Sequence, residues 1–171
     1  LAQLSDRLDG AGSLPAQAPG EGPSAGDDAL VLYTSGSTSA PKAVPLRQHA
    51  VIENGFNIGE RQGLGPSDRV LLSSPLFWAF GSANALPATW SHGACLVLME
   101  KFDAALALDV IEREKCTAIY TLPAMTAAMA RHPSYRTERL ASLRTGLTIG
   151  SAEEFVFAVQ ALQVAELCNI Y

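Results

Sequence analysis

Six short apolar runs, separated by longer segments with helical spacing, constrain the fold of this chain more than any other feature. Polar residues do not interrupt the runs, which is typical of strands that are buried on both faces. This β–α alternation predicts an α/β fold with a largely parallel, doubly wound sheet and helices on both faces. The runs are ALVLY (29–33), RVLLSS (69–74), ACLVLM (94–99), TAIYT (117–121), GLTIG (146–150) and CNIY (168–171).

The segments between these runs are predicted to be helices. Asp103 is expected to cap one of them through its carboxylate, and Pro123 suits the first turn of another. In a sheet of this kind ligands gather at the carboxyl ends of the strands, so functional residues are expected just after the apolar runs. The predicted helices cover residues 46–55, 83–90, 104–115, 124–131 and 153–163.

The first 28 residues differ in composition from the rest of the chain. Residues 10–28 are rich in Gly, Pro, Ala and Ser and have almost nothing to bury, which indicates a flexible connector. The preceding LAQLSDRLDG is expected to end an upstream helix. Residues 29–171 then form the predicted domain. Because the last apolar run stops before any turn, we expect both ends of the sequence to be cut from a longer protein.

Composition and charge argue against several functional classes. The formal charge is -5 and the Lys and Arg residues are scattered, so we expect no nucleic-acid partner. No apolar run approaches the ~18 residues that span a bilayer. Three widely spaced cysteines favour a reduced cytoplasm over a disulfide framework. His49, His92 and His132 lie far apart, so no metal site is expected, and Asp68–Arg69 is interpreted as a surface ion pair.

An unbroken run of small hydroxyl residues and glycine, TSGSTS (34–39), follows the first apolar run. Polyphosphate oxygens need many donors at short range. The hydroxyls, the backbone around Gly36 and the charge of Lys42 would supply them. A Walker loop needs Gly-Lys-Ser/Thr in succession, whereas this chain has APKA (40–43), so the P-loop NTPase class is excluded. On composition alone, a Ser/Thr-rich surface turn is the alternative interpretation of this run.

The order of strand, TSGST, two residues and Pro-Lys resembles the YTSGSTGxPKGV signature of the adenylate-forming superfamily. This superfamily includes acyl-CoA synthetases, luciferases and the adenylation domains of peptide synthetases. The resemblance implies a grip on the β- and γ-phosphates of ATP, with Thr38 and Lys42 as catalytic residues. Ser39 and Ala43 replace usual glycines, and a position that needs positive φ would cost about 1 kcal/mol and weaken ATP binding. The implied phosphate-binding residues are Thr34, Ser35, Gly36, Ser37, Thr38 and Lys42.

The segment SPLFWAFG (74–81) resembles the PxFHxxG segment of the same superfamily, which lines the acyl pocket. The resemblance implies that Trp78, Phe80 and Gly81 border the acyl group, with Trp78 where histidine is common. No Asp between residues 71 and 90 could pair with a substrate ammonium, so a carboxylic acid without an α-amine is expected. A core aromatic cluster is the alternative reading of the same residues.

Two later segments resemble nucleotide-binding parts of the superfamily. LRTGLTIGSA (143–152) is similar to a strand with a GGA-type turn, which implies that Gly150, Ser151 and Ala152 meet the nucleotide. Ser151 replaces the common second glycine. Asn169 and Tyr171 match the opening of the NxYGxTE segment, which implies contacts with the adenine base. Taken alone, both segments could also be ordinary strand ends.

The resemblance as a whole implies a fragment of an ATP-dependent acid–thiol ligase, an AMP-forming acyl-CoA synthetase acting on a fatty or aromatic acid. It also implies Mg²⁺, with a ligand Glu beyond Tyr171, and coenzyme A or a carrier-protein phosphopantetheine as acceptor. The isolated chain is expected to be inactive. A non-catalytic nucleotide-binding or interaction module is the alternative. The particular acid, the acceptor and the oligomeric state stay open.

Overall fold

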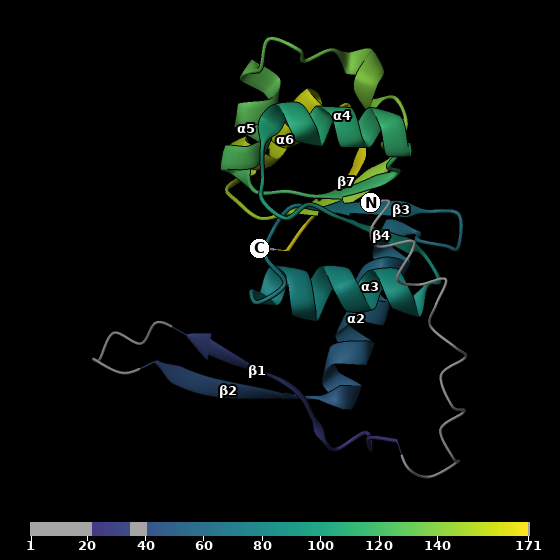
Figure 1. Cartoon of the computed structure of the whole chain (residues 1–171), viewed down its shortest axis with the longest axis vertical. Coiled ribbons are helices and arrows are strands. Elements are labelled where there is room, and N and C mark those ends of the chain that lie inside the picture. Colours follow the sequence, from purple (N-terminus) through teal and green to yellow (C-terminus); the bar gives the residue numbers. More distant parts are fainter. Residues whose placement is uncertain (1–21, 35–40, 171) are drawn as a thin grey trace, which may run out of the picture.

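A computed structural model of the chain describes residues 22–34 and 41–170. Within these ranges five strands form one parallel sheet in the order β4-β3-β5-β6-β7, so the prediction of an α/β fold with a parallel sheet is confirmed (Figure 1). The strands are β3 (Arg69–Leu72), β4 (Cys95–Leu98), β5 (Ala118–Tyr120), β6 (Thr145–Thr148) and β7 (Glu166–Asn169).

Helices cover both faces of this sheet (Figure 1). On one face lie α4 (Ala104–Glu114), α5 (Pro123–Arg131) and α6 (Ala152–Leu162), and η2 (Thr137–Leu140) packs beside α4. On the other face lie α2 (Gln48–Gln62), the π-helix η1 (Phe80–Ala85) and α3 (Leu86–Ser91). The chain leaves β3 for β4 on one side and returns through α4 to β5 on the other. The sheet is therefore doubly wound, as predicted.

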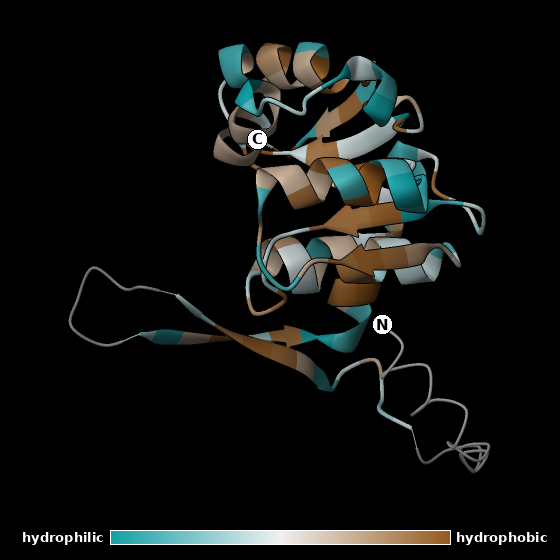
Figure 2. Cartoon of the chain, turned by 45° about the horizontal axis from the view of Figure 1, so that its top comes forward, coloured by the Kyte–Doolittle hydropathy of each residue, from teal (hydrophilic) through white to brown (hydrophobic). Residues whose placement is uncertain are grey.

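The central strands β3 and β5 bury alternate residues in different cores, because successive side chains of a strand point to opposite faces. Leu71 and Ile119 pack with α4, α5 and α6. Their strand neighbours Val70, Leu72 and Tyr120 pack on the side of α2 and α3. The edge strand β4 is only partly covered, with Leu98 53% exposed, so the prediction of burial on both faces was wrong for this run. Brown, hydrophobic colour accordingly predominates along several strands of the sheet, with paler segments in others (Figure 2).

Local capping explains where several helices begin. The Asp103 carboxylate accepts a hydrogen bond from the Leu106 N–H at 2.9 Å, and Pro123 occupies the first turn of α5, so both predictions are confirmed. The helix predicted over 46–55 was misplaced and covers Gln48–Gln62. The helix predicted over 83–90 is divided between two elements, because residues 83–85 belong to the π-helix η1 and the α-helix α3 begins at Leu86.

The first apolar run does not join the sheet. Instead, β1 (Asp28–Thr34) pairs antiparallel with β2 (Lys42–Arg47) in a separate hairpin that extends from the body (Figures 1 and 2). Val31 is 46% exposed and Tyr33 is 73% exposed, so the prediction of a strand buried on both faces was wrong. The unbroken apolar pattern reports strand character but does not specify the neighbouring strand.

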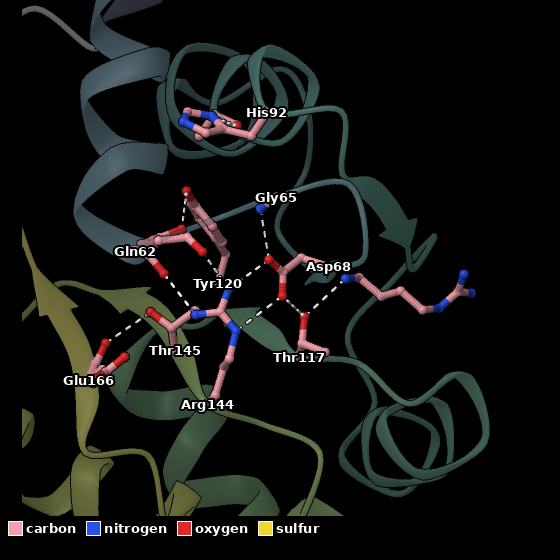
Figure 3. Close-up of polar contacts among 12 residues, drawn as sticks. Gln62, Gly65, Asp68, His92, Thr117, Tyr120, Arg144, Thr145 and Glu166 are labelled. Atoms are coloured by element: carbon pink, nitrogen blue, oxygen red, sulfur yellow. Dashed lines mark hydrogen bonds and ion pairs between the residues drawn. The ribbon is translucent and has the colours of Figure 1, made fainter.

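Asp68 is buried, which corrects its interpretation as a surface partner of Arg69. It is 5% exposed, and its carboxylate accepts hydrogen bonds from Arg144 at 2.6 and 3.2 Å and from the Thr117 hydroxyl at 2.6 Å (Figure 3). The Gly65 N–H donates at 2.8 Å. Arg69 instead pairs with Glu114 at 2.7 Å, because neighbouring side chains of an extended chain diverge.

This cluster joins the amino ends of three strands to the end of a helix. Asp68 precedes β3, Thr117 precedes β5 and Arg144 precedes β6, while Arg144 also donates to the carbonyls of Gln62 and Gly63 at 3.0 and 2.7 Å. Burial alone raises the pKa of Asp68, but hydrogen bonds from Arg144, Thr117 and Gly65 outweigh burial and lower it. The carboxylate is therefore held ionised inside the fold.

Asp68→Asn tests this cluster. Losing the charge that faces Arg144 should lower the free energy of unfolding by about 2–3 kcal/mol at pH 7. Because folding lowers this pKa, the contribution is present above the unfolded-state value of about 4 and is lost as pH falls through the folded value. Variant and wild type should thus converge in urea denaturation at acidic pH. Asp109→Asn, at the exposed pair with Arg139, is the control, and equal losses in both variants would contradict the prediction.

Two glycines bring α2 and α3 into close contact. A Cβ at Gly55 would lie 2.4 Å from the Pro87 Cβ and 2.8 Å from the Ala88 nitrogen. A Cβ at Gly59 would lie 2.3 Å from the His92 ring, which also faces Glu60 at 3.2 Å. The helices could not approach this closely with larger residues at these positions.

Gly55→Ala is expected to destabilise the fold. Alanine favours a helix by about 1 kcal/mol over glycine, but overpacking costs about 1–3 kcal/mol. Because the added Cβ would meet backbone atoms, the cost should lie near the upper end, and a net loss of up to about 2 kcal/mol should appear as a lower denaturation midpoint. Gly65→Ala is the matched control, because nothing lies within 4 Å of a Cβ built there. Equal midpoints for the two variants would contradict the prediction, because they would show that the α2–α3 contact accommodates an added methyl group.

Candidate functional site

The predicted site residues of the sheet lie at the carboxyl ends of its strands. Residues 73–81 follow β3, residues 149–152 follow β6, and Asn169 ends β7. The connections of β3 and β5 run on opposite faces of the sheet, so the winding reverses between these neighbouring strands. Ligands of doubly wound sheets bind in the crevice beside such a reversal.

Gly150 has a backbone conformation that other residues rarely adopt. Its φ is 147°, and a Cβ there would lie 2.9 Å from Glu154 Oε2 and 3.0 Å from Pro123 Cγ. Glycine is therefore required for this tight turn between β6 and α6.

Ser151 begins α6 through a capping box. Its hydroxyl accepts a hydrogen bond from the Glu154 N–H at 3.3 Å, while the Glu154 carboxylate accepts one from the Ser151 N–H at 2.8 Å. The two bonds satisfy backbone donors that the first turn of a helix leaves free. Ser151 thus has a local structural role where the superfamily commonly has a second glycine, and Ala152 is the first residue of α6.

Asn169 lies next to this turn although it is 19 residues away in sequence. Thr148 and Asn169 are register partners in β6 and β7, and Asn169 Nδ2 donates to the Gly150 carbonyl at 3.1 Å. The structure therefore brings together two segments that the sequence assigned to nucleotide binding. Tyr171, the other residue assigned to the base, lies outside the described residues.

The predicted phosphate loop is described only at its two ends. Thr34 and Lys42 face each other as register partners of the hairpin, and Lys42 is exposed. Ala43 pairs with Tyr33 within extended β2, so left-handed strain does not arise there. The other assigned residues, Ser35, Gly36, Ser37 and Thr38, and also Ser39, lie outside the described residues.

The three residues assigned to the acyl pocket have different environments. Trp78 is 49% exposed and borders a cavity of about 500 Å³, which Phe77, Leu76 and Ser82 also line. Phe80 is 9% exposed and packs edge-to-face on Tyr120 with ring centroids 5.5 Å apart, so it belongs to the core cluster. Gly81 lies against the chain before it, where a Cβ would be 2.8 Å from the Pro75 carbonyl oxygen.

Residues 30–33 of β1 form the opposite wall of this cavity. The sequence analysis missed them as lining residues because it placed their apolar run inside the sheet. One signal was available: Pro45 lacks an N–H and is typical of an edge strand, which favours a short hairpin over a central position.

Two titratable groups lie beneath the site. Burial raises the pKa of the Tyr120 phenol, which donates to Gln62 Oε1 at 3.3 Å, and burial also raises the pKa of the Cys168 thiol. In the part of the chain that the structure describes, no three His, Cys, Asp or Glu side chains are grouped to hold a metal ion. No helix there has the length and apolar character needed to cross a membrane.

Two curated relatives are named as CoA ligases. The chain is 39% identical over 123 residues to an indoleacetate–CoA ligase of Aromatoleum aromaticum, a match covering 70% of this chain and 24% of the relative. It is 31% identical over 153 residues to the mitochondrial medium-chain acyl-CoA ligase ACSF2 of Mus musculus, covering 85% and 25%. The chain therefore spans about a quarter of the length of these curated relatives.

Solved structures show the same fold. The inhibitor-bound N-terminal domain of FACL13 from Mycobacterium tuberculosis aligns with a TM-score of 0.76 at 22% identity, covering 100% of this chain and 42% of that one. A model of the family described as AMP-binding enzyme matches residues 2–169, almost the whole sequence. Because this match spans almost the whole sequence, the chain belongs to the AMP-binding enzyme family.

Proposed function

We propose that this chain is part of an ATP-dependent acid–thiol ligase. The enzyme would activate a carboxylic acid as an acyl-adenylate and pass the acyl group to a thiol. Family membership and the ligase names of the relatives support this assignment. The observation that carries it is the contact of Asn169 with the Gly150 turn, because it joins the two segments assigned to the nucleotide at adjacent strand ends. Residues 1–28 would be a connector and residues 29–171 part of the AMP-binding domain.

In the first step, a substrate carboxylate oxygen attacks the α-phosphorus of ATP and pyrophosphate leaves. Thr34, Lys42 and the loop between them would hold the β- and γ-phosphates, so that the charge of Lys42 stabilises the leaving group. Positioning and charge neutralisation account for most catalysis of this kind. Gly150–Ala152, Asn169 and Tyr171 would hold the adenosine end. The described residues offer no cluster for Mg²⁺, so we assign it no step and expect its ligand beyond Tyr171.

The acid would carry an alkyl or aryl group and no α-amine. The cavity of about 500 Å³ beside Trp78 is lined by apolar and aromatic side chains and by Ser82, with no charge among its described lining residues. An ammonium buried there would lack a partner, which is costly. Phe80 and Gly81 would support the side of the cavity that Trp78 forms. The relatives' names favour coenzyme A as the acceptor over a carrier-protein phosphopantetheine.

ATP–pyrophosphate exchange by the full-length protein, with a panel of fatty, aromatic and amino acids, tests the assignment. We expect exchange with fatty or aromatic acids and none with α-amino acids. Lys42→Ala should lower kcat/KM for ATP about 10- to 100-fold, because a hydrogen bond to a charged group contributes about 1.5–3 kcal/mol. Lys101→Ala, which removes an exposed lysine before α4, should leave exchange unchanged.

Two results would contradict the assignment. Equal activity of Lys42→Ala and wild type would contradict the assignment of the hairpin to phosphate binding. Calorimetric binding of ATP without exchange, for any acid and with a folded protein, would favour the non-catalytic module.

A further inference from the structure

A single peptide unit connects α6 to the end of β7. The peptide between Gly150 and Ser151 donates its N–H to Glu154 Oε2 at 2.8 Å. Its carbonyl, on the Gly150 side, accepts from Asn169 Nδ2 at 3.1 Å. A peptide unit is planar, so its N–H and C=O rotate together. Any rotation that weakens the bond to Glu154 therefore also displaces the acceptor of Asn169.

The Glu154 carboxylate is closely packed on this turn. A Cβ added to Gly150 would lie 2.9 Å from Glu154 Oε2 and 3.2 Å from its Cβ, so the side chain fills the space beside the glycine. Glycine can adopt many other conformations, so its φ of 147° depends on surrounding contacts. The charged acceptor provides a strong one.

We propose that Glu154 is a positioning residue for base recognition, acting on Asn169 through the Gly150–Ser151 peptide. This inference rests on the proposed function. An Asn amide has a donor end, Nδ2, and an acceptor end, Oδ1. The bond from Nδ2 to the Gly150 carbonyl holds the donor end against the turn. Adenine presents an amino donor where guanine presents a carbonyl acceptor. The bond to the Gly150 carbonyl therefore favours the amide orientation that suits adenine, and displacing this carbonyl would weaken the preference for adenine over guanine.

A plain capping role for Glu154 would have different consequences. A capping box stabilises the start of a helix by about 1 kcal/mol. Acidic side chains in the first turn also interact favourably with the helix dipole. Glu153 shares the first turn and the charge, but it is exposed and makes no hydrogen bond to the turn within the described residues. It is therefore the matched control, since its removal weakens the dipole interaction without releasing the peptide.

The test uses the full-length protein and its ATP–pyrophosphate exchange. Glu154→Ala should raise the KM for ATP about tenfold and lower the preference for ATP over GTP by a similar factor, with kcat changed less than about twofold. Glu154→Gln should restore both values, because its amide oxygen can accept the same N–H. Glu153→Ala should match wild type in both.

Glu154→Asp provides a second variant if the alanine variant fails to fold. It keeps the charge at the start of α6 but is one methylene too short for the present contact, so its KM for ATP should also rise. The inference is overturned if the variants at position 154 lose thermal stability while KM and the ATP/GTP ratio stay at the Glu153→Ala values.

A wild-type protein without exchange would contradict the proposed function rather than this inference. Calorimetric binding of AMP then decides. A dissociation constant about tenfold weaker in Glu154→Ala than in Glu153→Ala would support the positioning role. Equal constants, or no AMP binding by wild type, would overturn it.

Discussion

The geometry of the sheet depends on the ion pair between Asp68 and Arg144. A buried carboxylate would destabilise the fold without partners, but here Asp68 accepts four hydrogen bonds from three residues, and the partly exposed guanidinium also reaches two carbonyls at the end of α2. The strands that follow, β3, β5 and β6, have only three or four residues each. A strand rises about 3.3 Å per residue, so fixing their first residues also fixes where they end. The candidate site is built on those ends.

The sheet and the hairpin contribute different parts of the proposed site. The strand ends carry the turn at Gly150 and Asn169, which we assign to the nucleoside. The hairpin carries Thr34 and Lys42, which we assign to the phosphates. The cavity beside Trp78 has one wall from β1 and one from the segment after β3.

Much of the fold could be predicted because local rules agree with the tertiary structure. Five of the apolar runs became parallel strands, which are buried at the centre of the sheet and partly exposed at the edge strand β4, while Asp103 capped α4 and Pro123 began α5. The run 29–33 has the same apolar character but pairs with β2, because pairing depends on contacts that a single run does not encode. Phe80 shows the same limit within the site, since its ring packs on Tyr120, which is distant in sequence.

The sequence by itself determined the family signature, the β–α alternation and the residue types available for a phosphate and base site, because these depend on local order along the chain. The tertiary structure alone decided that Asp68 pairs with Arg144 rather than Arg69, and that Asn169 bonds to Gly150. Both contacts join residues brought together only when separate strands align in the sheet. The physical reason is that a charged or amide side chain bonds to the polar group that lies beside it in the folded structure, and this group need not be near it in sequence.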